Sequence, residues 1–506
     1  MTSSISRRDF IKVAGLTPLG LASAPLLKLH APSGTARNVI LVVFDAWSAY
    51  HLSIYGYPRE TMPNLSRLAK RAIVYHNHFA AGNYTTPGTA SLLTGTYPWT
   101  HRALDSDTDV IRTYMTRQLF STFSDYYRAA YTHNPWAATL LQQFVADIQD
   151  LIPWRSLFLR PYSDVVGTLF GRDQDTSSVA WVRGMTLRGY GYAYSLFLSH
   201  LYDALRKGED ADLKRQFPRG APTVPPDDDF RLEQAIDAVR ELLPAIPQPF
   251  LGYFHFLPPH APYNTSAEFY NRFHKDGYVP LEKPEDAFTQ HVSPQFLASK
   301  RAEYDEFILY VDREFGRLYD SLQSSGLLEN SWLILTSDHG EIFERGQIEH
   351  GNPSLYQAVV RVPLLIFEPG RETGMDIHDL TSAVDLLPTL AHITGHRVPD
   401  WAEGQVMTPF ATDGGNATPS IYAVQARHAV ETKPLTQASI MLVKGRYKLV
   451  YYFGYGDRHV DQLVQLYDIQ ADPEELVDLS ASQQGVADAM LQELKAKLRE
   501  KDAPYQ

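Results

Sequence analysis

Two uninterrupted apolar runs constrain the fold of this chain more than any other feature. They are residues 38–44 and 332–336, and both are rich in Val, Ile and Leu. Continuous runs of this kind are typical of strands buried on both faces, as in a parallel sheet covered by helices. Further strands are predicted at 73–80, 250–256 and 362–367. The sequence therefore predicts an α/β fold with a mostly parallel central sheet flanked by helices.

The predicted helices lie between these strands and near the end of the chain. Their apolar residues recur at helical spacing. The expected ranges are 61–69, 138–150, 230–243, 304–322, 383–394 and 486–497. A chain of 506 residues is long enough for a large α/β core and a smaller second unit. We expect a catalytic domain over residues 37–410 and a C-terminal α+β subdomain over 411–506, where strands are predicted at 440–443 and 447–453.

Residues 105–247 have a mixed pattern and are interpreted as a large helical insertion beside the site. The insertion contains an aromatic-rich stretch and, at residues 222–229, a proline-rich and acidic segment. The aromatic residues are Trp181, Tyr190, Tyr192, Tyr194 and Phe197. Such side chains line a groove for a glycan or a lipid head group in some proteins, but ordinary packing between helices is the favoured interpretation.

Composition excludes several classes of partner and of chemistry. The formal net charge of −12 argues against nucleic acid or an anionic membrane as the main partner. The chain has no cysteine, which removes disulfides, thiolate nucleophiles and cysteine-bound zinc. Any metal site must therefore use Asp, Glu, His or Asn. Composition gives no indication of the oligomeric state.

The N-terminus has the pattern of a twin-arginine export signal. Arg7 and Arg8 precede Phe10 and Lys12, and a mildly apolar run follows to Leu27. This run contains prolines, so it is a poor candidate for a stable membrane span. We expect residues 1–36 to be a signal peptide that directs the folded protein to the periplasm or the exterior.

A hydroxyl-rich turn at residues 83–95 precedes a short helix-compatible run. Thr85 or Thr86 is expected at the N-cap, with Pro87 in the first helical turn. A hydroxyl at this place lies in the positive field of a helix N-terminus, close to free backbone N–H groups. The stretch alone is also compatible with an ordinary capped helix.

Acidic and imidazole side chains follow two of the buried strands directly. Asp45 follows the first, and Asp338 and His339 follow the run at 332–336. The carboxyl ends of parallel strands share one edge of a sheet, so these side chains are expected to converge. Two carboxylates and an imidazole suit a divalent cation. A stiff proline-flanked loop at 258–262 presents His260.

The order and spacing of these segments resemble the sulfatase family of the alkaline phosphatase superfamily. The resemblance covers almost all of the expected mature chain except the insertion. The segments that carry it are 38–45, 62–69, 85–97, 259–263, 336–341, 361–364, 384–390 and 466–473.

The family pattern starts with a Cys or Ser that is converted to formylglycine, followed at fixed spacing by Pro and Arg. Here Thr85 stands at the first position and Thr89 replaces the Arg. Threonine does not yield formylglycine by the family's route. Relatives with Thr at this place look like phosphoglycerol and phosphoethanolamine transferases, which attack phosphodiesters with the Thr itself. The resemblance therefore implies that Thr85 is the nucleophile.

The family's paired acidic residues after the first strand are reduced to one here, because Ala46 follows Asp45. The resemblance thus implies a sparse site for one divalent ion (Mn, Zn, Mg or Ca). The implied ligands are Asp45, Thr85, Asp338 and His339. His260 and His350 match positions that contact the transferred group or the leaving oxygen, and are expected to be catalytic.

The leading hypothesis is an exported, metal-dependent hydrolase or transferase that acts on phosphate esters, diesters in particular, or on sulfate esters. A second hypothesis is a sulfatase that works without formylglycine. A third is an inactive protein that binds a glycan or a lipid head group through the aromatic insertion. Retention of the acidic and imidazole residues together argues against the third hypothesis.

The export interpretation predicts the behaviour of a double variant. Replacing Arg7 and Arg8 with Lys should leave the protein in the cytoplasm of a host that has the twin-arginine system, because the receptor reads the arginine pair. Fractionation and immunoblotting against the unchanged chain measure the distribution. Normal export of the double-Lys variant would contradict the interpretation.

Overall fold

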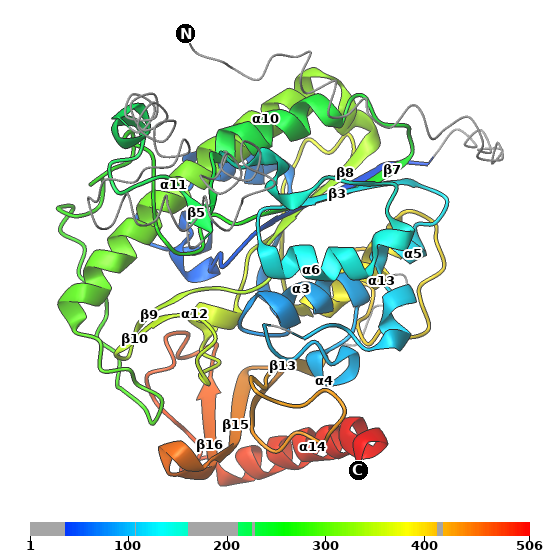
Figure 1. Cartoon of the computed structure of the whole chain (residues 1–506). Coiled ribbons are helices and arrows are strands. Elements are labelled where there is room, and N and C mark those ends of the chain that lie inside the picture. Colours follow the sequence, from blue (N-terminus) through cyan, green and yellow to red (C-terminus); the bar gives the residue numbers. More distant parts are fainter. Residues whose placement is uncertain (1–35, 107, 160–210, 225–227, 412–417) are drawn as a thin grey trace, which may run out of the picture. The chain divides into compact units, whose positions relative to one another are not determined.

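A sheet of eight strands lies at the centre of the fold, and its strands β3, β7 and β8 are labelled in Figure 1. The computed structural model describes residues 36–106, 108–159, 211–224, 228–411 and 418–506. The strand order is β12-β2-β11-β8-β1-β7-β3-β4. The strands are β1 (Asn38–Phe44), β2 (Ile73–Phe79), β3 (Tyr127–Thr132), β4 (Asp150–Leu151), β7 (Phe250–Phe256), β8 (Ser331–Thr336), β11 (Leu364–Phe367) and β12 (Met375–Ser382).

Strand β1 lies inside this sheet and is buried along its whole length. It pairs in parallel with β7 on one side and with β8 on the other. Val43, near its carboxyl end, is in register with His255 of β7 and Thr336 of β8. Within the described part of this sheet, only β11 runs antiparallel to its neighbours. The predicted α/β class and mostly parallel sheet are confirmed.

Helices cover both faces of the sheet. Alternate residues of β1 point to opposite faces, and on each face they pack into a hydrophobic core with the helices of that side. Ile40 and Val42 belong to the core under α2, α10 and α11. Val39 and Leu41 belong to the core under α3, α6 and α13. The helices of these two layers are α2 (Pro63–Leu68), α3 (Thr85–Thr94), α6 (Pro135–Gln143), α10 (Leu232–Leu242), α11 (Pro294–Ser324) and α13 (Leu386–Ile393).

The start of α3 differs from the expectation. Tyr84 holds the N-cap position, and α3 begins at Thr85. Neither threonine forms a side-chain cap hydrogen bond, so the expected capping role was wrong. The helix ends where Gly95 takes a positive φ of 68°, a conformation that glycine adopts without strain. The Thr85 hydroxyl is thereby left for other partners.

The interpretation of residues 105–247 as a single insertion also needs correction. Strand β3 lies within that range, yet it pairs in parallel with β7 in the central sheet, and β4 pairs with β3. Helix α6, which follows β3, packs against α3. This part of the range is thus an integral part of the core. The aromatic stretch at 181–197, like residues 1–35 of the expected signal peptide, lies outside the described residues.

A four-stranded antiparallel sheet and a helix form the C-terminal part, as expected for an α+β subdomain. These elements are β13 (Ile421–Gln425), β14 (Ala438–Lys444), β15 (Tyr447–Tyr455), β16 (Val460–Asp468) and α14 (Gln484–Asp502). The boundary at residue 410 stays a prediction. Other α-helices and strands of the described residues are α4 (Pro98–His101), α5 (Leu119–Thr122), α12 (Gln357–Val360), β5 (Thr223–Val224), β6 (Asp228–Asp229), β9 (Ile342–Glu344) and β10 (Gln347–Glu349).

Buried ionic contacts join the C-terminal sheet to the rest of the protein. The Lys448 ammonium of β15 pairs with the Glu475 carboxylate, and both side chains are almost fully buried. The same carboxylate accepts the backbone N–H of Gln357 at the start of α12, at 2.8 Å.

No helix among the described residues combines the length and the apolar character needed to cross a bilayer.

A glycine-to-alanine pair tests how closely α3 approaches the sheet edge. A Cβ at Gly88 would lie 2.3 Å from the backbone oxygen of Asp338, whereas a Cβ at Gly485 in α14 meets nothing within 4 Å. Gly88→Ala should destabilise the protein by about 1–3 kcal/mol through overpacking. Gly485→Ala should be neutral or stabilise it by up to about 1 kcal/mol, since alanine favours helix.

Urea unfolding of the two variants and the parent measures this difference. A Gly88→Ala protein as stable as Gly485→Ala would show that the helix and the Asp338 backbone are not in close contact.

Candidate active site

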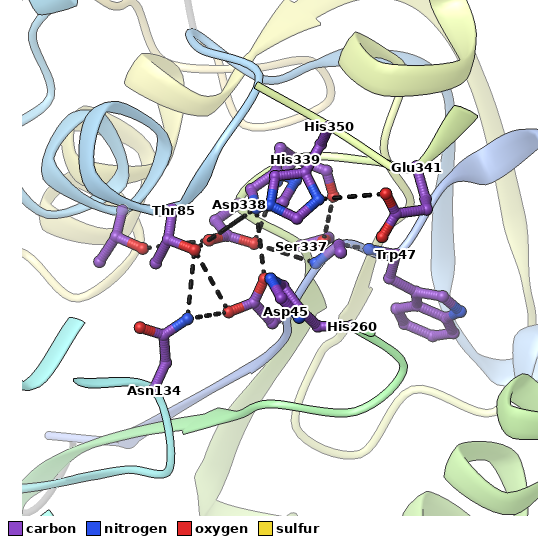
Figure 2. Close-up of polar contacts among 12 residues, drawn as sticks. Asp45, Trp47, Thr85, Asn134, His260, Ser337, Asp338, His339, Glu341 and His350 are labelled. Carbon is purple, nitrogen blue, oxygen red and sulfur yellow. Dashed lines mark hydrogen bonds and ion pairs between the residues drawn. The ribbon is translucent and has the colours of Figure 1, made fainter. Parts of the chain in front are cut away.

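Two buried carboxylates lie at the carboxyl edge of the central sheet. Asp45 follows β1 and Asp338 follows β8, and neither side chain is exposed. His339, next along the chain, places its Nε2 atom 3.2 Å from Asp45 Oδ1 and 3.7 Å from Asp338 Oδ2. The convergence predicted from the strand ends is therefore observed (Figure 2).

A second imidazole, which the sequence analysis missed, lies against the same carboxylates. His255 is the last residue but one of β7. Its Nε2 atom is 3.3 Å from Asp45 Oδ2 and 3.8 Å from Asp338 Oδ2. Candidate ligand atoms of these three residues all lie within 4.8 Å of one another. The available signal was a lone histidine in an otherwise apolar, fully buried strand.

Thr85 at the start of α3 presents its hydroxyl to this cluster. Its Oγ1 atom lies 3.5 Å from Asp45 Oδ2 and 3.5 Å from His339 Nε2. The side chain of Thr86 points elsewhere, and its Oγ1 reaches the Ser106 carbonyl at 3.4 Å. The structure therefore brings Thr85, and not Thr86, to the carboxylates.

Asn134 supports the Thr85 hydroxyl and was also missed. Its Nδ2 donates to Asp45 Oδ2 and, at 3.1 Å, to Thr85 Oγ1. Its Oδ1 accepts the backbone N–H groups of Trp136 and Ala137, which caps α6. Both ends of this amide are thus held. The signal in the sequence was an Asn-Pro pair separated by one residue from the end of a strand, a common helix start.

His260 and His350 complete the group of predicted residues. The His350 ring centroid lies 4.3 Å from that of His339 and 4.7 Å from that of His260. His350 Nδ1 contacts Glu341 Oε1 at 3.1 Å, and His260 Nδ1 contacts the Ala261 carbonyl at 2.7 Å. Figure 2 shows Thr85 and Asn134 on one side of the carboxylates and His350 with Glu341 on the other.

The carboxylates are held in different electrostatic states. Burial opposes ionisation of Asp45, but interactions with His255 and His339 outweigh it and hold the pKa of Asp45 well below its usual value. Burial, together with the charge of Asp45, raises the pKa of Asp338. Like charges this close favour the protonation of one partner unless a cation lies nearby.

The imidazoles respond to these charges in opposite directions. Burial opposes protonation of His339, but the charges of Asp338 and Asp45 raise its pKa to about 9. Burial and the charges of His339 and His260 lower the pKa of His350 well below its usual value. Burial raises the pKa of Glu341, its partner, well above the usual value. His350 is therefore a neutral imidazole beside a carboxyl group that gives up its proton less readily than usual.

The donor set fits a divalent cation. Among the described residues no Lys or Arg pairs with Asp45 or Asp338. Asp45 Oδ1 and His255 Nε2 are buried, and neither forms a hydrogen bond. Buried carboxylates without such partners are costly to maintain. Carboxylate ligands suit Mn, Mg or Ca, and imidazole ligands suit Zn.

Comparison with known proteins places this arrangement in context. The sulfatase family profile matches residues 37–396. A profile described as the C-terminal region of N-sulphoglucosamine sulphohydrolase matches residues 350–503. Two segments of the chain, one large and one C-terminal, thus have counterparts in sulfatases.

The chain is similar in sequence to two sulfatases and in fold to a phosphonate monoester hydrolase. The chain is 25% identical to an ulvan-active sulfatase of Formosa agariphila, over 73% of this chain and 64% of that protein, slightly under two thirds of its length. It is 23% identical to a choline-sulfatase of Rhizobium meliloti, over 84% of this chain and 79% of that protein. The fold is similar to that of a phosphonate monoester hydrolase of Agrobacterium radiobacter, with a TM-score of 0.65 at 17% identity over 92% and 96% of the two chains.

Metal content provides a direct test of the cluster. We expect about one tightly held divalent ion per chain, as for other clustered sites. Asp338→Asn removes one charge at nearly constant volume and should abolish this binding while the fold survives. Asp385→Asn is the matched control, because Asp385 is a buried carboxyl that accepts two backbone N–H groups elsewhere.

Metal analysis after dialysis, with circular dichroism to check folding, distinguishes the two variants. Full metal content in folded Asp338→Asn protein would refute the assignment of this cluster.

Proposed function

The chain belongs to the sulfatase family of ester hydrolases, and we propose that it hydrolyses phosphate esters, diesters in particular, with Thr85 as the nucleophile. The observation that carries this proposal is the place of the Thr85 hydroxyl. It faces Asp45 and His339 and receives a hydrogen bond from Asn134. The similar proteins are named for sulfate esters and for phosphonate monoesters, so an anionic ester is the expected substrate class.

The proposed cation is held by Asp45, Asp338, His339 and the Thr85 hydroxyl. A divalent ion bound there supplies positive charge for the ester oxygens and lowers the pKa of a hydroxyl group beside it. The remaining functions belong to the side chains around it.

Thr85 attacks the phosphorus atom in this proposal. As the bond from Oγ1 to phosphorus forms, the hydroxyl proton moves toward Asp45 Oδ2, which already accepts it at 3.5 Å. The bond from phosphorus to the leaving oxygen breaks. Asn134 keeps the attacking oxygen in place, since its amide is held from both ends.

His350 and His260 act on the opposite side. His350 is neutral, so it gives the Nε2 proton to the leaving oxygen while its Nδ1 takes the proton of Glu341. His260, held through Nδ1 by the Ala261 carbonyl, balances charge on the transferred oxygens. Water then attacks phosphorus and gives one proton to His350 Nε2, while Nδ1 returns its proton to Glu341. The bond from phosphorus to Oγ1 breaks, and the proton on Asp45 returns to the Thr85 hydroxyl.

The nucleophile itself favours phosphate over sulfate. A formylglycine hydrate has two hydroxyl groups, and the second allows a sulfated intermediate to collapse by elimination. Thr85 has a single hydroxyl and no such exit. A phosphothreonine, in contrast, is open to direct attack at phosphorus.

Hydrolysis of sulfate esters without formylglycine is the second candidate function. It is supported by the names of the two relatives, one active on ulvan and one on choline sulfate. In this case water must attack the sulfur atom of a sulfothreonine directly.

For both candidate functions, the proposed leaving group is an anionic glycan or a lipid head group. The protein is proposed to act after export through the twin-arginine pathway.

The nucleophile is tested by a pair of neighbouring variants. Thr85→Ala should lower kcat by about 10³-fold or more, the scale observed when a covalent nucleophile is removed. Thr86→Ala should have a much smaller effect, because the Thr86 hydroxyl donates to the Ser106 carbonyl and not to the carboxylates. Steady-state kinetics with metal-loaded protein measure both effects. Near-normal activity of Thr85→Ala would rule out the covalent step.

Substrate class is tested with aryl esters of one leaving group. The purified enzyme should turn over the phosphodiester faster than the sulfate, because only the phosphorylated Thr85 has an efficient route to hydrolysis. Matched nitrophenyl esters separate this effect from leaving-group chemistry. Faster turnover of the sulfate would favour the second candidate function.

A further inference from the structure

His255 is a buried imidazole without an evident structural partner at one ring nitrogen. The side chain is fully buried at the carboxyl end of β7. Its Nε2 atom lies 3.3 Å from Asp45 Oδ2 and 3.8 Å from Asp338 Oδ2, yet forms no hydrogen bond with either. The nitrogen is thus directed between two carboxylates rather than at one of them. A hydrogen-bond donor would be aligned with a single oxygen.

The other ring nitrogen of His255 is held by a chain of hydroxyl groups. Nδ1 lies 3.0 Å from the Tyr253 hydroxyl. This hydroxyl also interacts with the side chain of Thr89, and Thr89 Oγ1 donates to Asp338 Oδ2 at 3.3 Å. A consistent direction of donation runs from His255 Nδ1–H to Tyr253, then to Thr89, and ends at the carboxylate.

The opposite tautomer would donate from Nε2 to Asp45, and this interaction lowers the pKa of Asp45 when no cation is bound. With donation from Nδ1 to Tyr253, in contrast, Nε2 carries no proton. Its lone pair then faces two carboxylates, an arrangement that is repulsive unless a cation lies among the three groups. Histidines that bind metals typically donate the second ring N–H to a fixed partner, which sets the tautomer. The Tyr253 hydroxyl has this relation to His255.

We propose that His255 is a direct ligand of the divalent cation, through Nε2, in addition to the four residues given above. The inference rests on the proposed function, because that function introduces the cation. It gives the cation two imidazole ligands, His255 and His339, on either side of Asp45. It also gives Tyr253 and Thr89 a role in orienting His255.

The number of imidazole ligands can be counted in the unchanged protein. The apoprotein, produced with ¹⁵N-labelled histidine and loaded with Mn²⁺, is studied by pulsed electron-nuclear double resonance. Two directly bound histidine nitrogens are expected. A single coupled nitrogen in the wild-type protein would overturn the proposal, and this result does not depend on the folding of any variant.

Variants then assign the couplings. His255→Gln should remove one nitrogen coupling and weaken Mn²⁺ binding by about 10–100-fold or more, at least the loss found for residues that only orient ligands. His133→Gln is the control, because His133 is also buried and its backbone N–H donates to the His255 carbonyl, but its ring stacks on Phe230. It should keep both couplings and the parent's affinity.

Tyr253→Phe provides a readout that a purely packing role would not produce. It keeps the ring but removes the partner of Nδ1, so both couplings should persist while Mn²⁺ affinity falls by about 10-fold. Unchanged affinity in Tyr253→Phe would show that the hydroxyl chain does not orient the ligand.

The outcomes separate this inference from the proposed function. If Asp338→Asn loses Mn²⁺ but folded His255→Gln binds it with unchanged affinity, the cation site stands and the role of His255 is refuted. If the wild-type protein binds no Mn²⁺ and no other divalent ion, both the cation and its fifth ligand are refuted.

Discussion

The burial of two carboxylates within one small volume is the constraint on which the rest of this structure depends. Removing each charge from water costs several kcal/mol or more, and Asp45 and Asp338 have only imidazoles, hydroxyls and amides nearby in the described structure. The fold tolerates this because both residues stand at the ends of strands that are rigidly paired. The parallel register of β1 with β8 keeps the charges close in spite of their repulsion.

The strands and the acidic residues that end them could be predicted because the signal is local. A continuous apolar run specifies a strand buried on both faces, and the polar residue after it must lie at the sheet edge. The pairing of Asp45 with Asp338 and His339 followed from this logic. His255 did not follow, because its position inside an apolar strand also fits a histidine that packs in the core. Only the pairing of Val43 with His255 shows that the ring lies at the functional edge.

Other errors have a similar physical origin. Strand β3 is short and contains alanines and an arginine, so its periodicity was too weak to separate it from the helices around it. Asn134 was not predicted as a site residue, because the strand that precedes it was not recognised. The threonines at the start of α3 have the composition of a cap, and composition alone does not distinguish a hydroxyl that caps a helix from one that faces a site. The contact of Gly88 with the Asp338 backbone decides this, since it sets where α3 begins relative to β8.

The central place of β1 has a consequence for the synthesis of this protein. Strand β1 leaves the ribosome early, but its neighbours β7 and β8 begin only at Phe250 and Ser331. At about 5–20 residues per second, the first of these partners emerges roughly 10–40 s later. During that interval a strand that is apolar from Val39 to Phe44 has no permanent pairing on either edge. The nascent chain is therefore expected to depend on chaperones that bind exposed strands. The ligands come together only after His339, the last of them, has been made, at about two thirds of the 506-residue chain.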